Sequence, residues 1–151
     1  NRISLLLTDD RMVAQDHPAS NQGKLADAFG STTAHIAPLD PAMDLPRFDL
    51  VWLGMGNDGH IASLFPNIDA TAEGDPAVIE VTPDPLPPEA PFKRLSLNLA
   101  ALINSRQIML VIRGEDKKEI IEAAIAGRND LPIARLIKAA NCPITIFWSA
   151  T

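Results

Sequence analysis

Four short runs of apolar residues recur along the chain and predict buried β-strands. They cover residues 3–7, 49–53, 107–112 and 144–148, and each is almost continuously apolar. A strand at the centre of a parallel sheet is covered on both faces, so its sequence lacks the alternation that a half-exposed strand shows. The pattern therefore predicts a mainly parallel sheet that contains these four segments.

Two further runs, residues 77–81 and 95–99, alternate more strongly between apolar and polar positions. This pattern is typical of strands with one exposed face, so we expect outer or antiparallel strands here. Their neighbours in the sheet are left open, because periodicity identifies a strand but not its partner.

Segments with the apolar spacing of helices separate the strands and cover residues 20–29, 115–126 and 132–139. Ser20 is the expected N-cap of the first helix, and Gly30 and Gly127 are the expected stops of the first and the second. Residues 82–91 hold five prolines, which withhold backbone donors from helices and sheets alike, so an extended loop is expected there.

The order strand, helix, strand predicts an α/β fold. We expect a mainly parallel central sheet with helices on both faces, as in Rossmann-like three-layer sandwiches. A length of 151 residues and a hydrophobic content of 46% suit a single domain over residues 1–151. Ligands of such folds bind at the carboxyl ends of the strands, so residues that follow predicted strands are the candidates for a functional site.

Three polar clusters follow predicted strands, at residues 8–11, 54–60 and 113–117. The second cluster has glycines at positions 54, 56 and 59, which is the spacing of a dinucleotide-binding loop. That interpretation requires a long crossover helix after the loop, whereas only about two helical turns fit before Pro66. The glycine spacing alone is weak evidence, and we favour another role for this loop.

Asp58 and His60 give the same loop a catalytic interpretation. Glycines let the backbone turn tightly and point amides at a ligand, and a histidine beside a carboxylate can act as a general base near neutral pH. A simpler alternative is that Asp58 caps a short helix and His60 packs against the edge of the sheet. The position at a strand end, the glycines and the neighbouring acids favour the catalytic interpretation.

Charge and cysteine content exclude several classes of protein. The formal net charge is −6 and no long run of Lys or Arg occurs, which argues against nucleic-acid binding but leaves a small anionic ligand open. Cys142 is the only cysteine, so no intrachain disulfide or multi-cysteine zinc site can form, and a reducing, cytoplasmic setting is expected. No segment has the apolar length that a membrane span requires.

The segment Gly54-Met-Gly-Asn-Asp-Gly-His-Ile-Ala-Ser-Leu-Phe-Pro66 closely resembles the signature loop of the 6-phosphogluconolactonases. Further segments are similar to other elements of that family and follow in the family's order: Thr8-Asp-Asp-Arg-Met-Val13, Asp16-His17 with Ser20-Asn21, Lys93-Arg-Leu-Ser-Leu97, Arg113-Gly-Glu-Asp-Lys117 and Leu131-Pro-Ile-Ala-Arg135. The resemblance covers nearly the whole chain and implies the α/β fold of the sugar-phosphate isomerases.

The related glucosamine-6-phosphate deaminases share the Gly-x-Gly-x-Asp-Gly-His core. Their loop continues into Phe-Asn-Glu-Pro, which supplies a glutamate to the catalytic histidine, whereas this chain has Ser63-Leu-Phe-Pro66. Their first strand end carries Asp-Glu-Tyr, where this chain has Asp9-Asp10-Arg11. Both differences favour the resemblance to the lactonases.

The resemblance implies hydrolysis of 6-phospho-D-glucono-1,5-lactone to 6-phospho-D-gluconate in the oxidative pentose phosphate pathway, with no metal and no organic cofactor. His60 is then the general base that activates water, and Asp58 orients His60 or the substrate. The amides around Gly54 and Gly56 are candidate donors to the substrate or its oxyanion.

Phosphate recognition falls to Arg11 and Lys117 under the same resemblance, and Asp9 shapes the site. Lys117 lies in the expected first turn of a helix, where the helix dipole disfavours a cation unless an anion binds there as well. The alternatives are an ion pair of Arg11 with Asp9 or Asp10 and a solvated surface role for Lys117. Arg94 is interpreted as surface charge.

Members of the family have an upstream segment, with a first strand and a Ser-Gly-Gly-Ser-type loop that contributes to phosphate binding, which has no counterpart in this sequence. We therefore expect an N-terminally truncated fragment of a single lactonase-like domain. Two alternative functions stay open: a sugar-phosphate-binding module without catalysis, and a glucosamine-6-phosphate deaminase or isomerase. The oligomeric state is not predicted.

Overall fold

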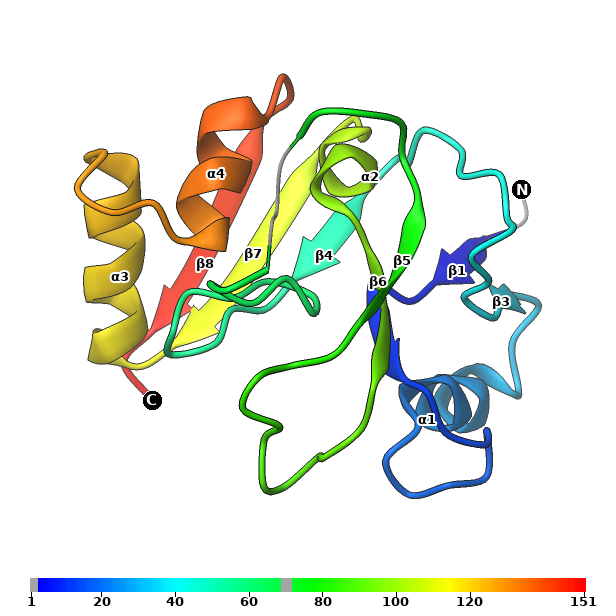
Figure 1. The fold of residues 1–151 in the computed structure, drawn as a ribbon. Helices are drawn as coiled ribbons and strands as arrows, with labels where there is room; N and C mark the ends of the chain where they lie inside the picture. The colour runs from blue at the N-terminus through cyan, green and yellow to red at the C-terminus, as the bar shows by residue number, and fades with distance from the viewer. Residues whose placement is uncertain (1–2, 69–71) are drawn as a thin grey trace.

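The computed structural model describes residues 3–68 and 72–151, along which helices are interspersed among strands (Figure 1). The strands are β1 (Ser4–Leu6), β2 (Asp9–Arg11), β3 (His35–Ala37), β4 (Val51–Leu53), β5 (Val78–Val81), β6 (Arg94–Leu97), β7 (Ile108–Arg113) and β8 (Ile144–Ser149). The helices are α1 (Asn21–Phe29), α2 (Leu99–Ile103), α3 (Glu115–Ile125) and α4 (Pro132–Ala139). The predicted α/β fold class is confirmed.

Among the described residues, the strands form three sheets of different kinds. β4, β7 and β8 pair in parallel in that order, β1 and β3 form a parallel pair, and β2, β6 and β5 form an antiparallel sheet. The parallel pairing predicted for the four apolar runs is confirmed, but β1 pairs with β3 in a separate sheet instead of joining β4, β7 and β8. β5 and β6 are antiparallel strands, as one of the two expectations for them had it. The apolar pattern does not predict β2 and β3, because each has only three residues.

One face of the β4–β7–β8 sheet carries the hydrophobic core. Leu53 of β4 and Leu110 of β7 are buried there against Ile133 and Leu136 of α4. Helices α2 and α3 add further buried residues to the same core. Figure 1 shows α3 and α4 on one side of β7 and β8, which is the side that this core occupies.

The opposite face of the same sheet is apolar and exposed. Successive side chains of a strand point to opposite faces, so Trp52, Val111 and Phe147 point away from the core. Their exposed fractions are 63%, 39% and 52%. Continuous apolar runs are typical of strands buried on both faces, but no described helix covers this side of the sheet.

The N-terminus of α1 is capped in the predicted way. The Ser20 Oγ atom accepts a hydrogen bond from the Gly23 amide at 3.0 Å. The carboxylate of Asp10, at the centre of β2, accepts two more from the amides of Asn21 and Gln22, at 2.7 and 2.8 Å. An anion at a helix N-terminus is stabilised by the helix dipole, so these contacts join β2 firmly to α1.

The remaining expectations for helices and loops are confirmed to within one residue. Helix α3 ends at Ile125, shortly before Gly127, whose φ of 67° lies in the left-handed region that favours glycine. Helix α4 spans the predicted residues, and residues 82–91 form neither helix nor strand. Of the described helices, none has the length and apolar character needed to cross a membrane.

The difference in burial between the two faces of β7 can be tested by substituting two neighbouring residues of the strand. We expect Leu110→Ala to lower the free energy of unfolding by about 2–5 kcal/mol, because it leaves a cavity in the core. Val111→Ala should cost less than about 1 kcal/mol, because that side chain faces solvent. Chemical denaturation followed by circular dichroism gives both values, and equal costs would contradict an exposed outer face.

Candidate active site

The loop after β4, residues 54–66, reverses its direction without forming a helix. Gly59 has a φ of 79°, in the left-handed region, and a bridge joins Ile61 to Leu64. Both of these side chains are fully buried in the core and anchor the loop. The alternative in which Asp58 caps a short helix is therefore wrong.

Asp58 and His60 form the central contact of this loop. Asp58 Oδ1 lies 2.6 Å from His60 Nδ1 and also accepts a hydrogen bond from the His60 amide at 3.2 Å. Partial burial raises the pKa of the Asp58 carboxyl, but the hydrogen bonds from His60 and the charge of its imidazolium lower it by more. The pKa of Asp58 is therefore below its ordinary value, and the carboxyl is ionised at neutral pH.

The contact with Asp58 sets the role of each imidazole nitrogen. An ionised carboxylate can only accept hydrogen bonds, so Nδ1 of His60 carries the proton that is donated to Asp58. In neutral His60 the lone pair is then on Nε2, which contacts no hydrogen-bonding group of the described residues. Because the His60 side chain is 30% exposed, this lone pair is accessible to water or a ligand.

Gly56 makes room for the histidine. A Cβ atom at residue 56 would lie 2.2 Å from Cε1 and Nδ1 of His60 and 2.7 Å from Asp58 Oδ1, closer than real Cβ contacts. The Gly56 amide donates to the His60 carbonyl at 2.9 Å, so the structure contradicts the expected donor role of this amide toward a substrate. At Gly54 a Cβ atom would meet open space, and the Gly54 amide donates to no acceptor within the described chain.

Ser63 connects the loop to the antiparallel sheet. Its amide donates to Ser96 Oγ at 3.1 Å, and its hydroxyl donates to Asp9 Oδ2 at 2.7 Å. Ser63 and Ser96 are fully buried, and Asp9 and Ser96 are opposite one another in the β2–β6 ladder. Asp9 thus reaches the loop through Ser63, rather than through contact with Asp58 or His60.

Arg11 lies on the same face of β2 as Asp9. Its Nη1 atom donates to Asn21 Oδ1 at 2.8 Å, and no carboxylate oxygen of the described residues is within 4.0 Å of its guanidinium. Asp9 is engaged by Ser63, and Asp10 is engaged by the amides of α1. The alternative of an ion pair between Arg11 and either acid is therefore wrong.

Arg94 is a site residue that the sequence interpretation misses. It is only 7% exposed, lies opposite Arg11 in the β2–β6 ladder, and places Cζ 5.5 Å from the centroid of the Phe65 ring. Burial lowers the pKa of the Arg94 guanidinium, the charge of Arg11 lowers it further, and Asp9 and Asp10 offset part of this. The expectation that Arg94 is surface charge is wrong.

Phe65 extends this contact to the histidine. Its ring centroid lies 4.7 Å from that of the His60 ring, so His60, Phe65 and Arg94 follow one another across the site. The sequence indicates which side chains share a face with Arg94, but not that this face is buried. Residues 94 and 96 are polar and two apart, so in a strand they share one face, and Ser96 is on the face that meets the loop.

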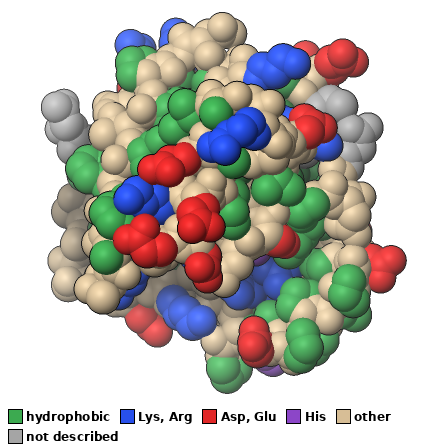
Figure 2. Space-filling view, turned by 90° about the vertical axis from the view of Figure 1, so that its left-hand side faces the viewer, with side chains coloured by type: hydrophobic (Ala, Val, Ile, Leu, Met, Phe, Trp, Pro, Cys, Tyr) green, Lys and Arg blue, Asp and Glu red, His purple; other side chains and the backbone are tan. Residues whose placement is uncertain are grey.

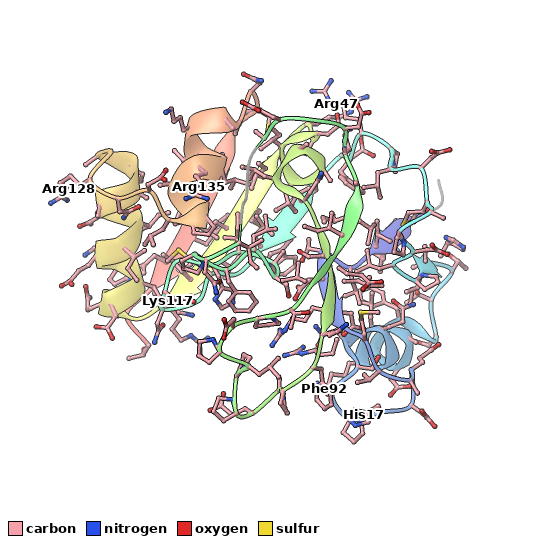
Figure 3. All side chains as sticks on the ribbon, in the orientation of Figure 1. His17, Arg47, Phe92, Lys117, Arg128 and Arg135 are labelled. Atoms are coloured by element: carbon pink, nitrogen blue, oxygen red, sulfur yellow. The ribbon has the colours of Figure 1, made fainter. Side chains whose placement is uncertain are left out.

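Lys117 lies in the first turn of α3, as expected, and its side chain is half-buried (Figure 3). The described contacts do not connect Lys117 with Asp58, His60 or Arg11. Figure 2 shows acidic and basic side chains interspersed on this side of the molecule. The neighbouring Lys118 pairs with Glu115 at 3.7 Å, whereas no such pairing of Lys117 occurs among the described residues. Its position is compatible with phosphate binding and with a solvated role.

One surface cavity borders this cluster at Arg11. It has a volume of about 500 Å³, and its lining includes Asp10 and Leu95, which are opposite one another on the other face of the β2–β6 pair. Neither Asp58 nor His60 lines it. Within residues 3–68 and 72–151, no group of three His, Cys, Asp or Glu side chains is placed to hold a metal ion.

Comparison with known proteins associates this cluster with one family. A family model described as glucosamine-6-phosphate isomerases/6-phosphogluconolactonase matches residues 31–148. The 6-phosphogluconolactonase of Mesorhizobium japonicum is 34% identical over 169 aligned residues, which cover 99% of this chain and 71% of that protein. The alignment with the Mesorhizobium protein includes both the loop after β4 and the β2–β6 pair.

Solved structures share the fold. A 6-phosphogluconolactonase from Shewanella baltica aligns with a TM-score of 0.73 at 28% identity, over 97% of this chain and 72% of its own. A monomeric glucosamine-6-phosphate deaminase aligns with a TM-score of 0.76 at 17% identity, over 98% and 73%. The second likeness concerns the fold alone. Together they confirm the predicted α/β sandwich class, and they leave the activity to be argued from the site.

The pKa of the Asp58 carboxyl reports on its contact with His60. An NMR titration of the carboxyl carbon should give a midpoint below that of an unfolded-chain aspartate, and His60→Ala should raise it. Because the folded-state pKa is the lower one, the contribution to stability is present above about pH 3.9 and is lost as the pH falls through the folded value. His35→Ala, in β3, is the control, and the pairing is contradicted if His60→Ala leaves the midpoint unchanged.

Gly56→Ala should disturb the same contact for a steric reason. The added methyl group occupies the volume of the imidazole, so the ring must move and the Asp58 midpoint should rise toward that of His60→Ala. Gly54→Ala, whose methyl group meets open space, is the matched control and should leave the midpoint in place. Identical titrations of the two variants would show that the packing of residue 56 does not position His60.

Proposed function

Because this chain belongs to the glucosamine-6-phosphate isomerase/6-phosphogluconolactonase family, we propose that it hydrolyses 6-phospho-D-glucono-1,5-lactone to 6-phospho-D-gluconate. The observation that carries this proposal is the Asp58–His60 pair, which leaves the Nε2 lone pair of a partly exposed imidazole free. Opening a lactone requires a water made nucleophilic, and a histidine held by a carboxylate is suited to that task near neutral pH.

The chemical step uses His60 first as a base and then as an acid. Water attacks C1 of the lactone while Nε2 takes one of its protons, which gives a tetrahedral oxyanion and an imidazolium. The oxyanion collapses, the bond between C1 and the ring oxygen breaks, and the imidazolium proton moves to that oxygen, which becomes a hydroxyl. Asp58 holds the Nδ1 proton throughout and stabilises the imidazolium, as the carboxylate does in a catalytic triad.

The substrate is held by groups around this pair. Arg11 is the first phosphate ligand in our proposal, because no acid neutralises its guanidinium in the described chain. Lys117 is the second, and the N-terminus of α3 favours a bound anion beside it. The free amide of Gly54 is the remaining candidate donor to the oxyanion. Asp9 holds the loop in place through Ser63.

The identity of residue 65 favours the lactonase over a deaminase. Sequences that resemble the deaminases carry a glutamate at this point of the loop, where it serves the histidine. Here Phe65 packs its ring 4.7 Å from the ring of His60, so an apolar group occupies the place of that acid. Asp58 is the acid that contacts the imidazole instead.

The setting of the reaction is part of the same proposal. We place it in the cytoplasm and in the oxidative pentose phosphate pathway, on the basis of the family and of a single cysteine that forms no disulfide. The substrate is a phosphosugar lactone, and neither a metal nor an organic cofactor takes part in the steps given above.

Removal of the base tests the proposal directly. His60→Ala should lower the rate of lactone opening, after subtraction of the spontaneous rate, by about 10²–10⁴-fold, which is the usual contribution of a general base. His35→Ala removes a histidine of β3 outside the site and should retain the full rate. A pH-stat or a coupled measurement of 6-phosphogluconate gives these rates.

Three outcomes would contradict the proposed function. Equal excess rates for the unchanged chain and His60→Ala would exclude His60 as the base. Binding of 6-phosphogluconate without any excess rate would favour a sugar-phosphate-binding module, and release of ammonia from glucosamine 6-phosphate would favour the deaminase.

Asp58→Asn should lower the rate of lactone opening with little change in KM, because an amide can stabilise the wrong imidazole tautomer.

A further inference from the structure

Two arginine side chains project from the same face of the β2–β6 pair. Arg11 and Arg94 are direct partners in the antiparallel ladder, so their Cβ atoms lie on one side of the sheet at about 4.5–5.5 Å. Like charges directly opposite one another destabilise a sheet. This arrangement therefore needs a compensating interaction.

The described residues do not supply that compensation. Neither guanidinium has a carboxylate oxygen within 4.0 Å among residues 3–68 and 72–151. The two nearby acids are engaged elsewhere, Asp9 by the Ser63 hydroxyl and Asp10 by the amides of α1. The charge of both arginines is thus only partly offset.

Both side chains also retain unpaired buried donors. The Nε atoms of Arg11 and Arg94 are shielded from solvent and donate to no acceptor within the described chain. Arg94 as a whole is 7% exposed. Buried donors are almost always satisfied in folded proteins, so two such groups side by side indicate that a partner outside the chain completes the arrangement.

We infer that Arg94 and Arg11 together form a binding site for the phosphate group of a sugar phosphate. Guanidinium groups are planar and donate two parallel hydrogen bonds to a phosphate, and a dianion between them replaces their repulsion by attraction. This inference rests on the proposed function, because that function supplies the phosphorylated substrate, and it adds Arg94 as a ligand of the phosphate.

The position of Phe65 indicates how a substrate would lie between the arginine pair and His60. Arg94 Cζ lies 5.5 Å from the centroid of this ring and the centroid of the His60 ring lies 4.7 Å from it, so the arginine pair and the base are both beside one aromatic side chain. A substrate with its phosphate at the arginine pair would extend past Phe65 to place its lactone carbonyl near Nε2 of His60.

The test uses the binding of inorganic phosphate, which involves no turnover. Isothermal titration calorimetry should show that Arg94→Met binds phosphate at least about tenfold more weakly than the unchanged chain, because hydrogen bonds to a charged group are lost. Arg128→Met removes the same charge beyond the far end of α3, where Arg128 is exposed (Figure 3), and should bind normally. Equal affinities for the two variants would overturn the inference.

Thermal unfolding separates ligand binding from a purely structural role of Arg94. Phosphate should raise the Tm of the unchanged chain and of Arg128→Met, but not that of Arg94→Met. In phosphate-free buffer, Arg94→Met should melt no lower than the unchanged chain, because an unpaired charge has been removed. A lower Tm without phosphate, together with unchanged phosphate affinity, would show that Arg94 only packs against Phe65.

A conservative variant keeps the test valid if Arg94→Met does not fold. Arg94→Lys retains the charge but loses the planar fork, so phosphate affinity should fall several-fold, and an unchanged affinity would overturn the inference. Failure of the two proposals can also be distinguished. If phosphate binding depends on Arg94 but no lactone is opened, the anion site stands and the proposed hydrolysis is wrong. If the chain opens the lactone but binds phosphate equally well without Arg94, the proposed hydrolysis stands and the anion site is wrong.

Discussion

The geometry of the site depends on the two hydrogen bonds that the buried Ser63 donates. A polar residue with no exposure must have its donors satisfied, and both acceptors of Ser63 come from the antiparallel sheet, as Asp9 Oδ2 and Ser96 Oγ. The loop follows β4 directly, and its Gly59 carbonyl accepts a hydrogen bond from the Ile133 amide of α4. Because His60 and Phe65 flank Ser63 in the chain, these two hydrogen bonds hold the base and the aromatic ring beside Arg94, which a different sheet supplies.

The acids of this region stabilise the architecture, and the arginines are left for a ligand. Asp10 satisfies the amides at the start of α1, Asp9 holds Ser63, and Asp58 holds His60. Each carboxylate therefore has a partner that is not an arginine. A chain with a formal net charge of −6 can in this way present a positive site to an anionic substrate, since local pairing matters more than the total charge.

Much of this fold could be predicted from periodicity, and much of the site could not. Runs of buried strand residues and helix stops such as Gly127 are local signals, and the structure confirms them. The sequence also placed Asp58 and His60 together, because they are two residues apart at a turn. The burial of Arg94 depends on strand pairing, and the role of Gly56 depends on where the imidazole packs. Both are tertiary effects, which a single sequence does not encode locally.

The bare apolar face of the β4–β7–β8 sheet has a consequence for how this chain behaves in solution. Two copies that meet through Trp52 and Phe147 would remove apolar surface from water, yet both copies carry the same excess of negative charge. That repulsion acts over a Debye length of about 8–10 Å at ordinary ionic strength and shortens as salt is added. Added salt therefore weakens the repulsion that opposes face-to-face contact of this apolar surface.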